Sequence, residues 1–297
     1  GFIARGVGSD GKCHYAASSN DQNFPWFLGL GKYLASGIPT ADERQTCTER
    51  LVRQLDALQK NEWRIPGDKP GFVRGWWLDG EYAAAVHLLT ACHVVYQATG
   101  DQKYLTMYYD FFNGTCRNQK TRKEILLAGP GNMAEWSCWF LSNCQYAVSE
   151  LARQEADPAV KAALLRSLKV TGNMAAPYIT YFERYGDVGK PSIFTPDWHL
   201  MMPPYREQSN GDEANVLAME QLKVWGKACP AVAREKSSLK PAWCAAWMVV
   251  LSQDPGLIAR NQAQIEAAIR YVDYDKLYYA TLFYVENLIY TMKLNAK

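Results

Sequence analysis

The chain has 297 residues, 48% of them hydrophobic, which is enough to bury the core of one large domain. Its 32 basic and 30 acidic residues are interspersed and leave a formal charge of +2, so we expect no nucleic acid and no anionic membrane surface as its main partner. The longest apolar runs fall well short of the roughly 20 residues that a membrane helix requires, which argues against membrane insertion.

In chain order, the predicted helices alternate between amphipathic and almost wholly apolar segments. The segment from Thr40 to Asn61 opens with a capping box, Thr40 and Glu43, and carries one apolar stripe, so we expect an outer helix. The segment from about Asp79 to Thr99 has hardly a charged residue before Gly100 ends it. We therefore expect it to be an inner helix that other helices enclose.

The alternation continues to the end of the chain. Asp101 is expected to cap a helix through Phe112, and the segment 131–152 is again apolar on most sides. Asp157-Pro158 and Asp254-Pro255 each combine an N-cap with a first-turn proline and precede an apolar stripe, which is typical of outer helices. The last segment, 276–294, is rich in Tyr, Leu, Phe and Ile and is expected to be enclosed.

Convincing strand periodicity is absent, so the sequence predicts an all-α fold. An inner ring of helices wrapped by an outer ring satisfies the alternation, and it predicts a single domain over residues 1–297. An irregular bundle or a right-handed solenoid is the alternative, although the alignable repeat of a solenoid is missing.

The eight cysteines form no CxxC pair, and with four histidines they cannot supply a zinc ligand set at standard spacing. We therefore expect no metal and no cofactor. Cys47, Cys92, Cys138 and Cys244 lie in apolar helical contexts and are predicted to be free thiols, while one or two disulfides elsewhere stay open.

Long aromatic, glycine-rich and polar connections between the helices are the places to look for chemistry. The first contains Arg5 and then Ser18, Ser19, Asp21 and Gln22, a polar group that can hydrogen-bond the hydroxyls of a sugar. The alternative is a helix start with Asp21 as its cap.

The second connection contains Arg74, Trp76, Trp77 and Asp79, and it is the strongest local signal in the chain. Indole faces stack on the apolar faces of sugar rings, and a carboxylate can perform acid–base chemistry. The alternative is that one Trp belongs to the core, Asp79 is an N-cap and Arg74 neutralises it.

Two further connections carry candidates. Glu135 and Trp136 open an inner helix, where the carboxylate either complements the helix dipole or faces a cleft. A Pro-rich segment holds Trp198, His199, Tyr205 and Arg206, and His199 is the histidine most suited to catalysis because His87 and His93 sit within a helix.

The alternating helices, together with Arg5-Gly, Asp10-Gly, Ser18 to Gln22, Trp76 to Asp79 and Glu135-Trp136, resemble the six-hairpin glycosidase superfamily, which includes unsaturated glucuronyl hydrolases. The resemblance implies an (α/α)6-type toroid of helical hairpins. Fewer helices are clear than the twelve of a complete toroid, which leaves open a missing N-terminal hairpin. No catalytic pair matches one family residue by residue.

The sequence and this resemblance predict a glycoside hydrolase that acts on a plant or microbial oligosaccharide or polysaccharide. Asp79 and Glu135 are the expected acid and base, in either order, and their separation would distinguish inversion from retention. Four tryptophans, Trp76, Trp77, Trp136 and Trp198, would stack on sugars. Arg5, Arg74 and Arg206 would pair with a uronate carboxylate.

Two alternatives stay open. A polysaccharide lyase on the same fold would use His199 or Tyr205 to remove a proton next to a uronate carboxylate. A glycan-binding protein without activity would use the aromatic cleft alone. The chain starts at Gly1 without a leader, which fits a processed secreted protein or a trimmed one equally, so a periplasmic or secreted location is an expectation only. The sequence does not determine the oligomeric state.

Overall fold

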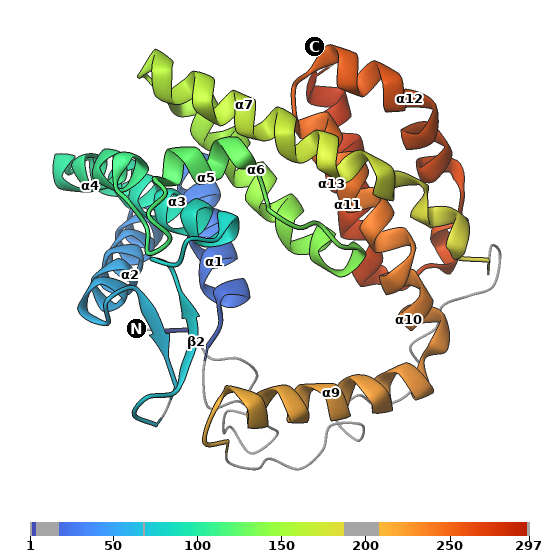
Figure 1. Cartoon of the computed structure of the whole chain (residues 1–297), viewed down its shortest axis with the longest axis horizontal. Coiled ribbons are helices and arrows are strands. Elements are labelled where there is room, and N and C mark those ends of the chain that lie inside the picture. Colours follow the sequence, from blue (N-terminus) through green and yellow to red (C-terminus); the bar gives the residue numbers. More distant parts are fainter. Residues whose placement is uncertain (1, 4–17, 68, 187–207, 296–297) are drawn as a thin grey trace. The chain divides into compact units, whose positions relative to one another are not determined.

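The two most apolar helical segments become the most deeply buried helices of the molecule. In a computed structural model, which describes residues 2–3, 18–67, 69–186 and 208–295, these helices are α3 (Tyr82–Thr99) and α11 (Leu239–Leu251). Every residue of α11 except Lys240 is buried, and α3 buries side chains around its whole circumference. The prediction of a helical fold is confirmed (Figure 1).

The chain divides into two compact units according to the contacts within it. Unit 1 comprises residues 1–126 and 203–220, and unit 2 comprises residues 127–202 and 221–297. The ring of hairpins and the single domain stay predictions.

In unit 1, α3 is the central helix. It packs against three helices of the same unit, α1 (Asn20–Ala35), α2 (Ala41–Lys60) and α4 (Gln102–Asn113). A Cβ on Gly31 of α1 would lie 2.9 Å from Cγ1 of Val94, so the glycine permits the close approach of α1 to α3. The described part of the unit also contains α5 (Arg122–Ala128) as far as Leu126 and the start of α9 (Gly211–Ala228).

Unit 1 also contains a short β-hairpin that the sequence analysis did not predict. Strand β1 (Arg64–Pro66) pairs antiparallel with β2 (Val73–Trp76), and the main-chain N–H of Trp77 donates to the carbonyl of Trp63 at 2.9 Å. Strands of three and four residues are too short to show an alternating pattern, which is why periodicity missed them.

In unit 2, α11 is the central helix. The elements of this unit are η1 (Glu135–Ser137), α6 (Cys138–Gln154), α7 (Pro158–Ala175), η2 (Ala176–Arg184), α10 (Pro230–Ser237), α11, α12 (Pro255–Arg270), η3 (Tyr274–Lys276) and α13 (Tyr279–Asn295). Helix α11 packs against α6, α7, α10, α12, α13 and η2. The buried amide of Gln145 on α6 donates to the carbonyls of Leu168 and Met248, at 2.8 and 3.1 Å, and so joins three helices.

Most predicted helix ends are confirmed. Thr40 and Glu43 form the capping box of α2, and Asp101, Asp157 and Asp254 each accept main-chain N–H groups at the starts of α4, α7 and α12. Gly100 ends α3 with a φ of 72°, in the left-handed region that glycine tolerates.

Two expectations about helices are wrong. Helix α3 begins at Tyr82 with Glu81 at its N-cap position, so Asp79 is not the cap. The last helix, α13, is not enclosed, because Phe283, Tyr290 and Leu294 are each more than half exposed. Its aromatic and aliphatic composition suggested burial, but it packs mainly against α11 and leaves these side chains uncovered.

The seven cysteines within the described residues are all free thiols, and the four predicted to be free are among them. Within the same residues, no helix is long and apolar enough to cross a lipid bilayer.

Candidate functional site

The candidate residues fall into three sets. Asp21, Arg74, Trp76, Trp77 and Asp79 belong to unit 1. Glu135 and Trp136 belong to unit 2. Arg5, Trp198, His199, Tyr205 and Arg206 lie outside the described residues.

In unit 1 the structure brings together two segments that the sequence analysis singled out separately. The indole N–H of Trp77 donates to Oδ1 of Asn20 at 3.0 Å, which ties the end of β2 to the first turn of α1. Trp77 is fully buried and also meets the ring of Phe27 edge to face. Trp77 is therefore a core residue, and its predicted role as a sugar-stacking platform is wrong.

The polar side chains at the start of α1 hydrogen-bond to one another. Ser19 occupies the N-cap position of α1, and its hydroxyl contacts the side chains of Asp21 and Gln22. Asn23 donates to the hydroxyl of Ser18 at 2.7 Å. Asp21 thus lies in the first turn of the helix and is not its cap. These contacts are those of a helix start, although Asp21 keeps part of its surface exposed.

Gly75 permits the contact between the two segments. A Cβ at this position would lie 2.0 Å from Oδ1 of Asn20 and 3.1 Å from Cδ1 of Ile65. Real Cβ atoms do not approach other atoms to 2.0 Å, so a larger residue would displace the asparagine.

Trp76, unlike its neighbour, is only partly buried. Its ring lies 5.2 Å from the guanidinium carbon of Arg64 and 4.9 Å from that of Arg117, and its N–H donates to the carbonyl of Glu62 at 3.1 Å. Both distances are typical of cation–π contacts. The indole is therefore engaged with two arginines, so a sugar would meet a positively charged surface there.

Arg74 and Asp79 make contacts within unit 1. Arg74 donates to Oδ1 of Asn215 at 3.0 Å and approaches the carbonyl of Gly211, which joins β2 to the start of α9. Asp79 accepts from the main-chain N–H of Gly80 at 2.8 Å. Burial raises the pKa of the Cys116 thiol, and the charge of Asp79 adds a smaller part to that rise. The Asp79 carboxylate therefore lies near this thiol.

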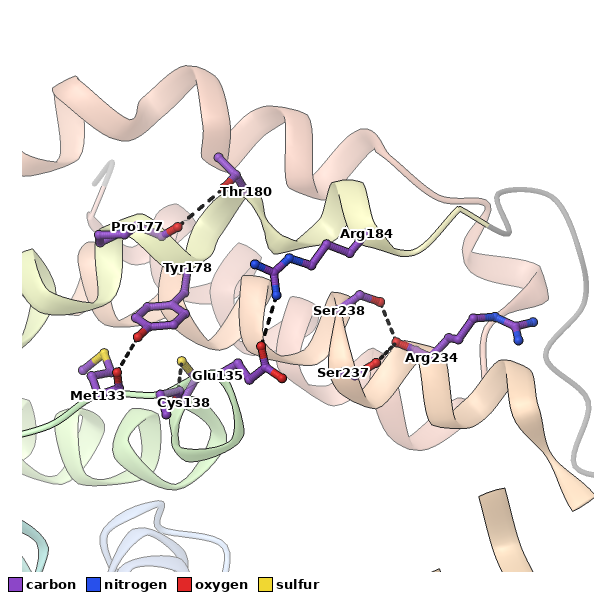
Figure 2. A network of polar contacts seen from close by, with 11 residues as sticks. Met133, Glu135, Cys138, Pro177, Tyr178, Thr180, Arg184, Arg234, Ser237 and Ser238 are labelled. Carbon is purple, nitrogen blue, oxygen red and sulfur yellow. Dashed lines mark hydrogen bonds and ion pairs between the residues drawn. The ribbon is translucent and has the colours of Figure 1, made fainter. Parts of the chain in front are cut away.

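In unit 2, Glu135 forms an ion pair that the sequence analysis did not predict. Nη1 of Arg184 on η2 lies 3.1 Å from Oε2 of Glu135 on η1, with the glutamate side chain 44% and the arginine 55% exposed (Figure 2). The guanidinium carbon of Arg184 also lies 3.3 Å from the ring centre of Tyr181. The carboxylate is thus half-exposed and held in one direction.

The backbone around Glu135 is fixed by its neighbours. The hydroxyl of Tyr178 donates to the carbonyl of Met133 (Figure 2). The hydroxyl of Ser137 also hydrogen-bonds the main chain of Ala134. Trp136, the next residue, is 75% exposed. The turn is therefore held in place by hydrogen bonds, and it carries a half-exposed carboxylate, Glu135, and an exposed indole, Trp136, at consecutive positions.

The sequence analysis missed a second feature of unit 2. The ammonium group of Lys240 on α11 lies 4.7 Å from the ring centre of Trp139 on α6 and 4.9 Å from that of Tyr284 on α13. Burial is the main cause that lowers the pKa of Lys240 to about 8; Cys244 opposes this decrease and the charge of Lys236 contributes a smaller part of it. The one signal for it in the sequence is a single lysine within the apolar segment 239–251.

Two buried thiols lie near these groups: Cys138 is close to Glu135, and Cys244 is close to Lys240. Burial raises the pKa of Cys138 to about 12, with smaller contributions from Cys244 and then Glu135. Burial likewise raises the pKa of Cys244 to about 12, opposed by a hydrogen bond with Ser142 and by the charge of Lys240. Both thiols stay protonated near neutral pH and supply no negative charge there.

Among the side chains that the structure describes, no group of three His, Cys, Asp or Glu residues is arranged to hold a metal ion. Comparisons of the chain with protein-family models, with curated proteins and with solved structures find no match. The resemblance to six-hairpin glycosidases therefore rests on the alternating helices and the short motifs alone. The predicted pairing of Asp79 with Glu135 stays a prediction, because the two residues belong to different units.

Proposed function

We propose that the chain is a glycoside hydrolase of the (α/α) toroid type, acting on a plant or microbial glycan with Glu135 as one of its two catalytic carboxylates. The observation that carries the proposal is the half-exposed Glu135 carboxylate, directed by Arg184 and followed by the exposed indole of Trp136. A carboxylate of fixed direction next to an uncovered aromatic ring suits a sugar and its glycosidic bond.

The ion pair favours one of the two roles for Glu135. A base that activates water, or a nucleophile that attacks the sugar, must be ionised, and an ionised carboxylate is the form with which a guanidinium pairs. Glu135 is therefore assigned the base or nucleophile role. The second carboxylate would then be the acid, the group that protonates the glycosidic oxygen.

The first test is product analysis with neutral, uronate-containing and unsaturated oligosaccharides, reading reducing ends and the absorbance of new double bonds. New reducing ends without absorbance support the hydrolase. Rising absorbance would assign a lyase, with His199 and Tyr205 as the candidate bases. No turnover on any substrate would contradict the proposal.

The decisive variant is Glu135→Gln, which keeps the shape of the side chain and removes its charge. We expect it to lower kcat by roughly 10³-fold or more, because an essential acid–base group is lost. Glu183→Gln is the matched control, since Glu183 is an exposed glutamate of the same unit next to Arg184. Equal activity of the two variants would remove Glu135 from the mechanism.

A glycan-binding protein without activity is a second candidate, and the exposure of Trp136 favours it. Exposed indoles serve binding as well as catalysis. In that case Trp136→Ala weakens binding to an immobilised glycan, whereas Glu135→Gln leaves it nearly unchanged and no substrate is turned over.

A further inference from the structure

Lys240 has two aromatic rings at its ammonium group, in the place where three other lysines of the described chain have a carboxylate. Lys103, Lys169 and Lys276 each pair with an aspartate, at 3.3, 2.6 and 3.1 Å. Lys240 instead points between Trp139 and Tyr284, and it is the one residue of α11 that is not buried. Its amine is thus held at the edge of an aromatic site and keeps some contact with solvent.

We propose that Lys240 is a carbonyl-reactive amine that binds aldehydes reversibly and covalently. Its unprotonated Nζ attacks the aldehyde carbon and forms a C–N bond, and the adduct then loses one water to give an imine. One amine and one aldehyde thus give one imine and one water, and hydrolysis reverses the reaction. Neither an oxidant nor a reductant is needed.

Desolvation without a counter-charge is what makes such a lysine reactive. Apolar surroundings disfavour the ammonium ion, and only the neutral amine is a nucleophile. With a pKa of about 8, roughly a fifth of the amine is neutral near pH 7.4, compared with roughly 0.1% for an ordinary lysine. The two rings also offer flat apolar walls against which the carbon skeleton of an aldehyde, including an open-chain sugar, can pack.

Within the described residues, the titratable groups near Lys240 supply no unpaired negative charge near neutral pH. On its own helix, Cys244 is a protonated thiol, and Lys236 of α10 is itself a cation whose pKa burial lowers. On α13, burial raises the pKa of the Tyr284 phenol, so it stays neutral. On η1, the carboxylate of Glu135 pairs with Arg184 of η2. The proposal makes no use of Glu135 and is independent of the glycosidase activity.

The test is reductive trapping on the full chain, with glycolaldehyde and cyanoborohydride in brief reactions and quantification of each modified lysine by peptide mass spectrometry. Lys60, an exposed lysine in the last turn of α2, is the internal reference. A lower pKa raises the neutral fraction of Lys240 but weakens its nucleophilicity, with a Brønsted slope of about 0.4–0.5 as for thiols, so we expect a net advantage of about tenfold near pH 7.4.

Two further measurements test whether fast labelling of Lys240 comes from its lowered pKa and its aromatic surroundings. The labelling rate of Lys240 should rise with a midpoint near pH 8, and Trp139→Ala should bring the rate near neutral pH down toward that of Lys60 by admitting water. A parallel reaction with a reducing disaccharide tells whether the site accepts a sugar aldehyde or only a small one. Labelling of Lys240 no faster than Lys60, or a midpoint above pH 10, would overturn the proposal.

Discussion

Trp77 and Trp136 carry the same signal in the sequence, an indole close to a carboxylate near the start of an inner helix, yet the structure treats them in opposite ways. Trp77 is completely buried and its N–H is bonded to Asn20, whereas Trp136 is 75% exposed. The difference lies in what faces each ring. β2 meets the first turn of α1 beside Trp77, while η1 is a short turn that leaves Trp136 uncovered. An aromatic motif in a connection therefore becomes a site only where nothing packs over it.

The largest effect that follows from this comparison is on folding. Trp77→Ala should lower the free energy of unfolding by about 3–5 kcal/mol, because it empties a fully buried indole site. The measurement is the shift of the urea midpoint followed by circular dichroism. Trp77→Phe keeps an aromatic ring and should cost clearly less. A change below about 1 kcal/mol for Trp77→Ala would show that the residue is not part of the core.

The hydrogen bond between Trp77 and Asn20 can also be disrupted by a substitution at Gly75. Gly75→Ala should cost about 1–3 kcal/mol of stability, because its Cβ must push Asn20 away and leave the buried indole N–H without its acceptor. In the background of Asn20→Ala the clash with the asparagine is absent and only the 3.1 Å contact with Cδ1 of Ile65 remains, so Gly75→Ala should cost much less. A double-mutant cycle by urea unfolding measures this coupling. Additive costs for the two substitutions would rule out the close contact.

The sequence predicted much of the fold because the relevant signals are local. Apolar composition identified α3 as an enclosed helix, and short capping patterns placed the starts of α2, α4, α7 and α12. Composition alone failed for α13, since an aromatic helix is buried only if neighbours cover all its sides. The hairpin of β1 and β2 was missed because strands so short carry no period.

The candidate sites were harder to predict because they depend on contacts between distant segments. Glu135 was identified from its position in a helix start, but its partner Arg184 lies 49 residues away and follows no pattern. The aromatic surroundings of Lys240 come from α6 and α13, which the sequence does not bring together. Packing decides which of several cations meets which ring, and no local rule encodes it.

A smaller effect is expected at Lys240, where unit 2 holds a charge among aromatic rings. Lys240→Met should stabilise the chain by about 1 kcal/mol near pH 7, because it removes a desolvated charge while giving up a cation–π contact. The folded-state pKa of about 8 lies below the ordinary value of 10.5, so the unfolded chain binds more protons between these values. The stability of the unmodified chain should therefore rise from about pH 8 toward pH 10.5, and this rise should be missing from Lys240→Met.

The stability of the unmodified chain and that of Lys240→Met are measured by thermal unfolding over this pH range. Lys103→Met is the matched control, because Lys103 is an exposed lysine that pairs with Asp101, and exposed pairs of that kind contribute little to stability. A loss of stability in Lys240→Met, with an unchanged pH dependence, would mean that the ammonium group is well accommodated between its rings.

The smallest effect on folding is expected at Trp136, and there the comparison with Trp77 becomes a test of function. Trp136→Ala should change the free energy of unfolding by no more than about 0.5 kcal/mol, because three quarters of the side chain already faces solvent. If Trp136 stacks on a sugar ring, the same variant should weaken glycan binding by roughly 1 kcal/mol, about fivefold in Kd, as measured by calorimetry on a substrate from the product screen. Trp136→Tyr retains an aromatic face and should recover most of the lost affinity. Recovery would show that the affinity depends on stacking and that Trp136→Ala did not act by altering the conformation of the turn. Unchanged affinity in Trp136→Ala would mean that exposure alone does not make this indole a binding platform, and the case for a sugar site in unit 2 would then depend on Glu135.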